Sequence, residues 1–166
     1  MADVIAIPSP LGRLELRPER ADDRDFRFHL FCRSRLPEWE MVQLDPPLRE
    51  QLMKQQFHAQ TVSYEQWFPR ARFDIIELDG ECIGRIVVDR PGDQIYIVNQ
   101  AIVPERRNQG LGTSIMQFLM AEAAAAGLPV RLKVADNNDP SLRLYLRLGF
   151  APIETVPAYI DMEWKR

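Results

Sequence analysis

The residues best suited to chemistry lie between a β-rich run and a helix-forming run, over residues 104–113, Pro-Glu-Arg-Arg-Asn-Gln-Gly-Leu-Gly-Thr. The first turn of a helix leaves backbone N–H groups unpaired and carries the positive end of the helix dipole. Gly110 and Gly112 remove side chains there, so an anion can approach these N–H groups closely. Arg107 adds a guanidinium suited to phosphate oxygens, and Thr113 adds a hydroxyl donor. The segment therefore predicts a phosphate-binding site.

Two common phosphate-binding motifs do not describe this segment. A P-loop needs a lysine before its Ser or Thr, and here Thr113 follows Gly112 directly. A dinucleotide-binding loop has a third small residue where this chain has Ile115, and it belongs to a parallel βαβ unit. A glycine-rich helix start without a ligand is the simplest alternative.

A second segment, over residues 138–150, reads Asn-Asp-Pro-Ser-Leu-Arg-Leu-Tyr-Leu-Arg-Leu-Gly-Phe. Asp139 is the expected N-cap of a short helix, Pro140 suits its first turn, and Gly149 is the expected stop. On helical spacing alone, Tyr145 would be a core aromatic residue.

Together the two segments resemble the GNAT N-acetyltransferase family. Arg-x-x-Gly-x-Gly, after a strand that ends in residues 101–104, is similar to the family's pyrophosphate loop. Asn-x-x-Ser-x-x-Leu-Tyr-x-x-x-Gly-Phe is similar to a family helix in which Ala is commoner than Ser141. The resemblance covers roughly residues 72–150, and the N-terminal third matches in outline only.

The resemblance implies an acetyl-CoA site where the GNAT sheet splays. The pantetheine arm would follow the backbone of Ala101, Ile102 and Val103, as an added strand does, and Asn138 would hydrogen-bond it. Arg107 would lie near the pyrophosphate. The backbone N–H groups expected to hold the pyrophosphate are those of Asn108, Gln109, Gly110, Leu111, Gly112 and Thr113. Acetyl-CoA is therefore the expected co-substrate.

Tyr145 is the catalytic residue that the resemblance implies, with its hydroxyl directed at the thioester sulfur. A phenol with an ordinary pKa of about 10 stays protonated at neutral pH and can donate to the departing thiolate as a general acid. A neutral amine would attack the carbonyl directly, and a backbone N–H near Ile102 would stabilise the tetrahedral oxyanion. Glu40, Asp45 and Glu81 are candidate general bases. A water chain would serve equally well, so the base stays unassigned.

The acceptor is expected to be the primary amine of a small molecule. In the family the acceptor site is built largely from the first two helices, their connection and the last strands. Here the connection carries Trp39, Glu40, Met41 and Asp45, an apolar surface with acidic spots that favours a cationic amine. A solvated loop with one anchoring tryptophan is the alternative. A protein or peptide acceptor and a non-catalytic acyl-CoA-binding module also stay open.

The elements that position these segments follow from patterning. Strands are expected over residues 14–17, 72–78, 81–90, 95–103, 130–135 and 159–164. Helices are expected from Asp22 or Asp23 to Leu36, where Pro37 ends the first, then from Pro47 through Phe57, over 63–69, 110–126 and 139–148.

The expected fold class is α/β of the α+β type. The resemblance specifies a GNAT fold with a mixed central sheet of about six or seven strands, splayed in the middle and flanked by about four helices. One domain is expected over residues 1–166. Residues 1–71 would hold the N-terminal strand and acceptor-side helices, 72–150 the acetyl-CoA-binding core and 151–166 the C-terminal strand.

Composition narrows the partners and the compartment. With 21 Lys+Arg against 24 Asp+Glu the net charge is −3, which disfavours a nucleic-acid partner. Cys32 and Cys82 are interpreted as buried apolar residues, and His29 and His58 lack ligand partners, so no metal site is expected. Residues 1–12 do not resemble a signal peptide, and no window approaches the roughly 18 apolar residues of a membrane span. A cytoplasmic protein without a membrane partner is expected, and family analogy leaves a homodimer open.

Overall fold

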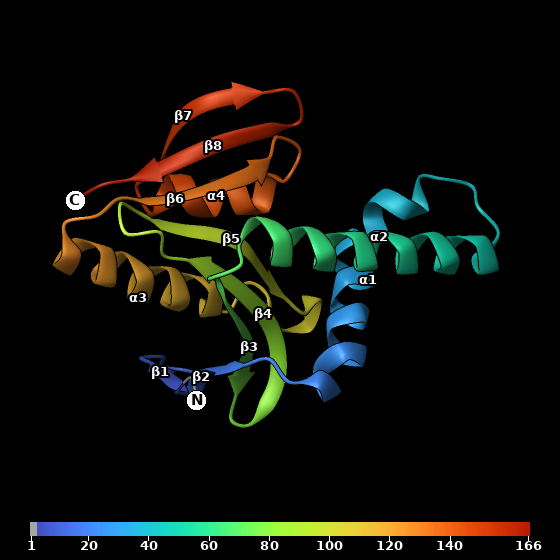
Figure 1. Cartoon of the computed structure of the whole chain (residues 1–166), viewed down its shortest axis with the longest axis horizontal. Coiled ribbons are helices and arrows are strands. Elements are labelled where there is room, and N and C mark those ends of the chain that lie inside the picture. Colours follow the sequence, from blue (N-terminus) through green and yellow to red (C-terminus); the bar gives the residue numbers. More distant parts are fainter. Residues whose placement is uncertain (1–2) are drawn as a thin grey trace.

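The structure is a computed structural model that describes residues 3–166. A sheet with the strand order β1-β2-β3-β4-β5-β6-β8-β7 forms its centre (Figure 1). The strands are β1 (Ile5–Ile7), β2 (Leu14–Pro18), β3 (Arg72–Leu78), β4 (Glu81–Asp89), β5 (Ile95–Ile102), β6 (Val130–Ala135), β7 (Ala151–Val156) and β8 (Tyr159–Trp164). The helices are α1 (Arg24–Glu40), α2 (Pro46–Trp67), α3 (Leu111–Ala126) and α4 (Asp139–Arg147), with short 3₁₀ turns η1 (Ala21–Asp23) and η2 (Pro104–Arg106).

The sheet parts between β5 and β6, its parallel pair. Residues Ile95 to Ile97 pair with Val130 to Leu132, and the pairing ends there although β5 continues to Ile102. The expected mixed, splayed sheet is confirmed, but among residues 3–166 it has eight strands rather than about six or seven.

A bulge in β5 coincides with the end of this pairing. Val88 of β4 pairs with Ile97 and Val87 pairs with Asn99, which leaves Val98 without a partner on β4. An extra residue reverses the face to which the following side chains point. The bulge therefore decides which residues of β5 face each side of the opening.

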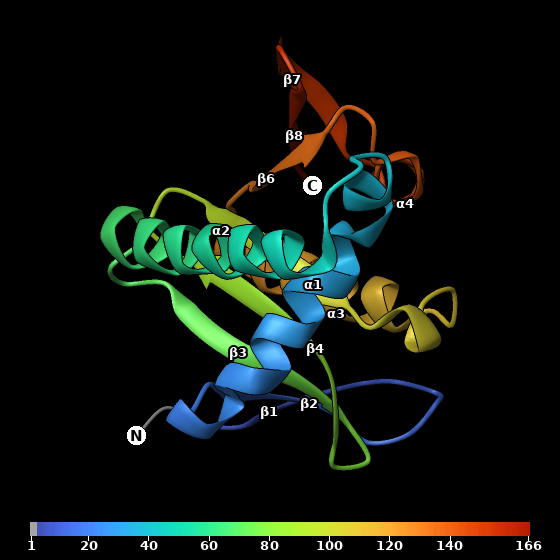
Figure 2. The ribbon, with the colours of Figure 1, turned by 90° about the vertical axis from the view of Figure 1, so that its right-hand side faces the viewer.

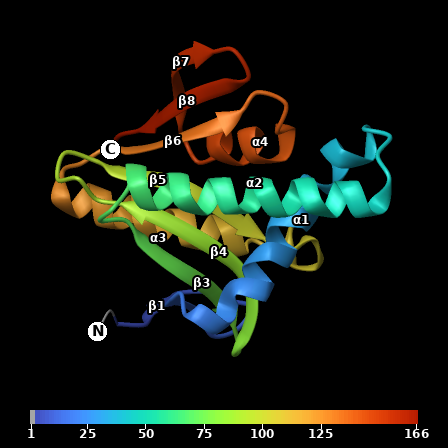
Figure 3. The ribbon, with the colours of Figure 1, turned by 45° about the vertical axis from the view of Figure 1, so that its right-hand side comes forward.

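Helices cover both faces of the sheet. The main apolar core joins α3 residues such as Ile115 and Leu119 to the strands, and Leu142 and Tyr145 of α4 pack against it. Helices α1 and α2 cover the other face and lie in front of the strands in Figures 2 and 3. Phe57 of α2 meets Phe28 and Phe31 of α1 edge to face, which joins these two helices.

Three expectations about the helices are wrong. Helix α1 continues through the exposed Pro37 to Glu40, because residues after a proline can still bond to the preceding turn. Helix α2 is continuous from Pro46 to Trp67, so Ser63 and Gln66 do not start a separate helix. No Gly or Pro interrupts residues 48–67, and a capping-box pattern alone does not end a helix. Asp139 is not the cap of α4, because Asn138 takes that position.

Two strands were not expected from the sequence, β1 and β7. They are the two edges of the sheet, and each pairs with one neighbour only. Strand β7 also contains Pro152, next to an irregularity in its pairing with β8. A short edge strand with a proline carries little of the alternation from which strands are predicted.

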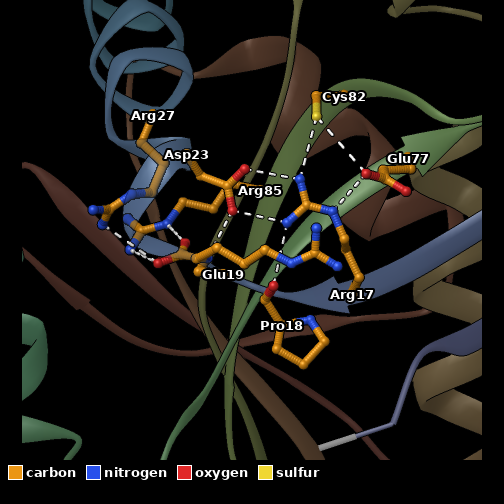
Figure 4. A network of polar contacts seen from close by, with 9 residues as sticks. Arg17, Pro18, Glu19, Asp23, Arg27, Glu77, Cys82 and Arg85 are labelled. Atoms are coloured by element: carbon orange, nitrogen blue, oxygen red, sulfur yellow. Dashed lines mark hydrogen bonds and ion pairs between the residues drawn. The ribbon is translucent and has the colours of Figure 1, made fainter.

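A network of polar contacts joins β2, β3, β4 and the start of α1 (Figure 4). Arg17 of β2, 7% exposed, donates from both terminal nitrogens to the carboxylate of Asp23 at 2.8 Å. Its Nε donates to Glu77 of β3 at 2.5 Å. Arg85 of β4 and Arg27 of α1 both pair with Glu19, and Cys82 lies beside Arg17. The network fixes the start of α1 to the sheet.

Candidate functional site

The loop between β5 and α3 is shaped by two residues with left-handed backbone. Asn108 has φ +60° and Gly110, the N-cap of α3, has φ +85°. A Cβ at Gly110 would have no neighbour within 4 Å, so the space at the helix start is open. The side chain of Leu111 is buried in the main core and holds the first turn of α3 in place. The loop thus presents an accessible helix N-terminus.

Ion pairs hold the base of this loop. Glu105 of η2 pairs with Arg33 of α1, and Arg106 pairs with Glu81 at 2.6 Å. Glu81, one of the candidate bases, is the first residue of β4, and its carboxylate is paired with Arg106.

Arg107 lies where the loop leaves β5. Its Nε donates to the backbone carbonyl of Ile102 at 2.9 Å, which orients the guanidinium. Burial, and next the charge of Arg33, lower the pKa of Arg107. The predicted phosphate-binding residues are thus gathered at one place, from Arg107 to Thr113.

The opening between β5 and β6 forms a cavity of about 160 Å³. Its lining comes from both parted strands, from the N-cap of α4 and from α4 itself. The lining residues are Ile97, Val98, Asn99, Gln100, Leu132, Lys133, Val134, Ala135, Asn138, Ser141 and Tyr145. Two predicted site residues, Asn138 and Tyr145, therefore lie on the cavity wall. Residues 101–103 lie further along the chain, between the cavity and the loop.

Tyr145 faces the cavity from α4. Its ring packs against Phe150, with 5.7 Å between centroids. Burial raises the pKa of Tyr145 to about 12. The phenol is therefore held in its protonated form.

Asn138 has a structural role as well as a place in the cavity wall. Its side-chain oxygen accepts a hydrogen bond from the backbone N–H of Ser141 at 3.3 Å and caps α4. Capping uses the amide oxygen only, so the amide nitrogen of Asn138 can still donate to a ligand.

The α2 side of the opening carries polar and aromatic groups to which the sequence analysis assigned no role. Asn99 donates to the hydroxyl of Tyr64 on α2 at 3.3 Å. Phe68 stacks on Tyr96 of β5, with 5.7 Å between ring centroids. A polar residue in an otherwise apolar strand, as Asn99 is, can be noticed in the sequence. Its hydrogen-bond partner Tyr64 is 35 residues away, so no local pattern predicts that contact.

The α1–α2 connection lies apart from the cavity. Glu40 ends α1, Asp45 precedes α2, and Met41 between them is 87% exposed. None of these residues lines the cavity. The connection does not line this cavity, whereas Tyr64 of α2 is hydrogen-bonded to Asn99 on the cavity wall.

The described residues give no sign of a metal centre. Among residues 3–166, no group of three or more His, Cys, Asp or Glu side chains comes together in a way that could hold an ion. Cys32 and Cys82 are half-buried rather than buried, and burial raises the pKa of both thiols. Over the same residues, no helix has the length and apolar character needed to cross a membrane.

Residues 32–150 match the model of the acetyltransferase (GNAT) family, which is more than half of the chain. The chain belongs to the GNAT family. The two motifs that resembled the family lie in the β5–α3 loop and in α4, which follow the two parted strands in the chain.

Curated relatives match part of this GNAT domain. Mycothiol acetyltransferase of Streptomyces avermitilis is 31% identical over 96 residues, 55% of this chain and 30% of that protein. The protein of the same name from Acidimicrobium ferrooxidans is 34% identical over 94 residues, 52% of this chain and 30% of that protein. The aligned part is thus less than a third of the length of these relatives.

Solved structures share the fold at low sequence identity. PaiA N-acetyltransferase from Thermoplasma acidophilum, in complex with coenzyme A, has a TM-score of 0.70 and 16% identity, over 92% of this chain and 99% of that one. Mycobacterium smegmatis RimJ, in complex with CoA-disulfide, has a TM-score of 0.64 and 19% identity, over 98% of this chain and 86% of that one. Both similarities concern the fold.

Proposed function

We propose that the protein is an acetyltransferase that moves an acetyl group from acetyl-CoA to the primary amine of a small molecule. The observation that carries the proposal is the opening between β5 and β6, with the Gly110 loop at one end and Tyr145 on its wall. Family membership and the acetyltransferase names of the relatives support it.

The residues present fit coenzyme A. The open space at Gly110 and the N–H groups of residues 108–113 suit a diphosphate, and Arg107 adds charge. Asn138 would donate to the pantetheine arm, and the backbone of residues 101–103 would run beside it. Acetyl-CoA supplies the acetyl group as an activated thioester.

Tyr145 would act as the general acid. A protonated phenol on the cavity wall can donate its proton to the sulfur as the thiolate departs. Preorganised backbone N–H groups on β5 would stabilise the oxyanion that forms when the amine attacks. No carboxylate lines the cavity in the part of the chain that the structure describes, so a water chain is the route we propose for the proton of the amine.

The acceptor would enter from the α2 side. Asn99 and the aromatic residues Tyr64, Phe68 and Tyr96 occupy this side of β5, which suits a small molecule with polar and apolar parts. The curated relatives are named for mycothiol, a small molecule, which agrees with this choice. A cytoplasmic location and a homodimer remain part of the proposal.

The test is an acetylation assay in which free coenzyme A thiol is measured against a panel of acceptors. Small primary amines should be acetylated faster than peptides. Faster acetylation of peptide N-termini would favour the protein-directed alternative. Binding of coenzyme A without turnover on any acceptor would favour a non-catalytic binding module, and failure to bind coenzyme A would contradict both.

A further inference from the structure

Gln100 is a polar residue on an apolar face. It lies on β5 two residues after the bulge at Val98 and pairs with Ile86 of β4. Ile86 belongs to the main core, and Ile102, two residues further on the same strand, packs against that core. Gln100 therefore points to the α3 side of the sheet, where its neighbours are apolar.

The side-chain amide of Gln100 is not satisfied by the protein. Within residues 3–166, its Oε1 is buried and has no hydrogen-bond partner. A buried carbonyl without a donor is unfavourable, and in folded proteins such a group is usually completed by water or a ligand. Gln100 also lines the cavity between β5 and β6. The missing donor can therefore come from a molecule in that cavity.

The position of the Gln100 side-chain amide indicates which part of a bound ligand could donate a hydrogen bond to its Oε1. Its Nε2 lies 3.4 Å from the place that a Cβ at Gly112 would take, so the side chain reaches from the cavity to the first turn of α3. The phosphates of coenzyme A offer no donor, and the thioester offers none either. The pantetheine arm between them carries the donors, which are two amide N–H groups and one hydroxyl.

We propose that Gln100 binds the pantetheine arm, with its Oε1 accepting a hydrogen bond from a pantetheine amide N–H. This assignment rests on the proposed use of acetyl-CoA. Asn138, on the α4 side of the cavity, has its amide nitrogen free to donate, because its oxygen caps the helix. One wall of the cavity thus supplies an acceptor and the other a donor, which is the pair of groups that a peptide-like amide requires.

The deciding variant is Gln100→Leu, tested by calorimetric titration and by melting of the full chain without ligand. Leucine has a similar size and removes the unpaired carbonyl. We expect affinity for coenzyme A to fall about tenfold, while the melting temperature without ligand stays the same or rises. Gln117→Leu, at an exposed position of α3, is the matched control and should leave both quantities unchanged.

A second ligand separates binding of pantetheine from binding of phosphate. Adenosine 3′-phosphate 5′-diphosphate has the phosphates of coenzyme A but no pantetheine. Gln100→Leu should bind this nucleotide as the unaltered protein does. Equal loss of affinity for both ligands, with a lower melting temperature, would show a structural role and overturn the inference.

The inference and the proposed function fail in different ways. If the unaltered protein binds coenzyme A and Gln100→Leu binds it equally well, the role of Gln100 is wrong and the proposed function stands. If the unaltered protein does not bind coenzyme A, the proposed function is wrong and the inference falls with it.

Discussion

At the scale of single residues, Tyr145 shows how a side chain can serve both packing and chemistry. Tyr145 packs against the apolar core, and it also lines the cavity between the parted strands. Burial disfavours the charged phenolate, which is why the pKa of Tyr145 is raised to about 12. The side chain is thus kept as a proton donor.

Tyr145→Phe should lower kcat about 100-fold and leave the affinity for coenzyme A nearly unchanged, because the ring remains and only the donor is lost. Steady-state thiol release and calorimetric titration measure the two quantities. Tyr159→Phe, at a position 48% exposed on β8, is the control. Unchanged turnover in Tyr145→Phe would exclude the phenol as the general acid.

The raised pKa also predicts how stability depends on pH. The unfolded chain loses the Tyr145 proton near pH 10, and the folded chain holds it to about 12. Since the folded state then binds more protons, this contribution to the free energy of unfolding is lost as pH rises from about 10 to 12. Denaturant unfolding over this range should show a shallower decline for Tyr145→Phe than for the unaltered protein. Parallel declines would contradict the assignment.

At the scale of elements, a comparison of two glycines distinguishes backbone strain in the β5–α3 loop from ligand binding there. Gly110 and Gly80 have nearly equal φ angles, +85° and +83°, and a Cβ at either would have no neighbour within 4 Å. Alanine should therefore cost about 1 kcal/mol of stability at both positions.

Only Gly110→Ala should weaken binding of coenzyme A, because Gly80 lies in the β3–β4 hairpin. Denaturant unfolding and titration of both variants measure the comparison. Equal affinity in the two variants would show that the ligand does not approach the backbone at Gly110.

Helix α1 gives a second prediction at this scale. Pro37 lies inside the helix and is exposed, so Pro37→Ala restores a backbone donor without disturbing the core. The free energy of unfolding should rise by about 1–3 kcal/mol. Pro46→Ala is the control, because Pro46 occupies the first turn of α2, where proline costs little. A melting temperature of Pro37→Ala equal to that of the control would contradict this.

The sequence predicted the elements whose signals are local. The bounds expected for β6 and β8 are confirmed, as is the stop of α3 at Gly127, because alternation and a glycine stop act within a few residues. The faces of β5 could not be predicted, because they depend on a bulge that forms only against β4. Asn138 and Tyr145 were selected because they belong to one local motif. Gln100 and Tyr64 were not selected, because their positions beside the opening depend on contacts between distant parts of the chain. The roles of Asn138 and Tyr145 remain predictions.

At the scale of the whole molecule, the ion-pair network holds the N-terminal segment to the sheet. Removing Arg17 would leave the buried carboxylate of Asp23 and the half-buried carboxylate of Glu77 without their partner. Arg17→Met should therefore lower the free energy of unfolding by about 3–5 kcal/mol. Arg13→Met, which breaks an exposed pair with Glu15, should change stability little. Denaturant unfolding measures both, and similar values for the two variants would contradict a structural role for the network.

The same network predicts the response to acid. Hydrogen bonds from Arg17, and next from the backbone of Arg20, lower the pKa of Asp23. This contribution is present above the ordinary pKa of an aspartate, about 4, and is lost as pH falls through the lower pKa of the folded state. Asp23→Asn should be less stable near neutral pH and should approach the stability of the unaltered protein as pH falls below 4. A stability difference that stays constant over this range would contradict the assignment.

The short parallel pairing of β5 and β6 has a consequence for amide exchange. Beyond Ile97 and Leu132 these strands offer each other no hydrogen bonds, so the facing amides of residues 98–102 and 133–135 lack a sheet partner on that side. A molecule inserted between them would slow deuterium uptake in both segments together, although they are about thirty residues apart in the chain. Protection that rises in step in these two segments would therefore report an occupied opening without any measurement of turnover.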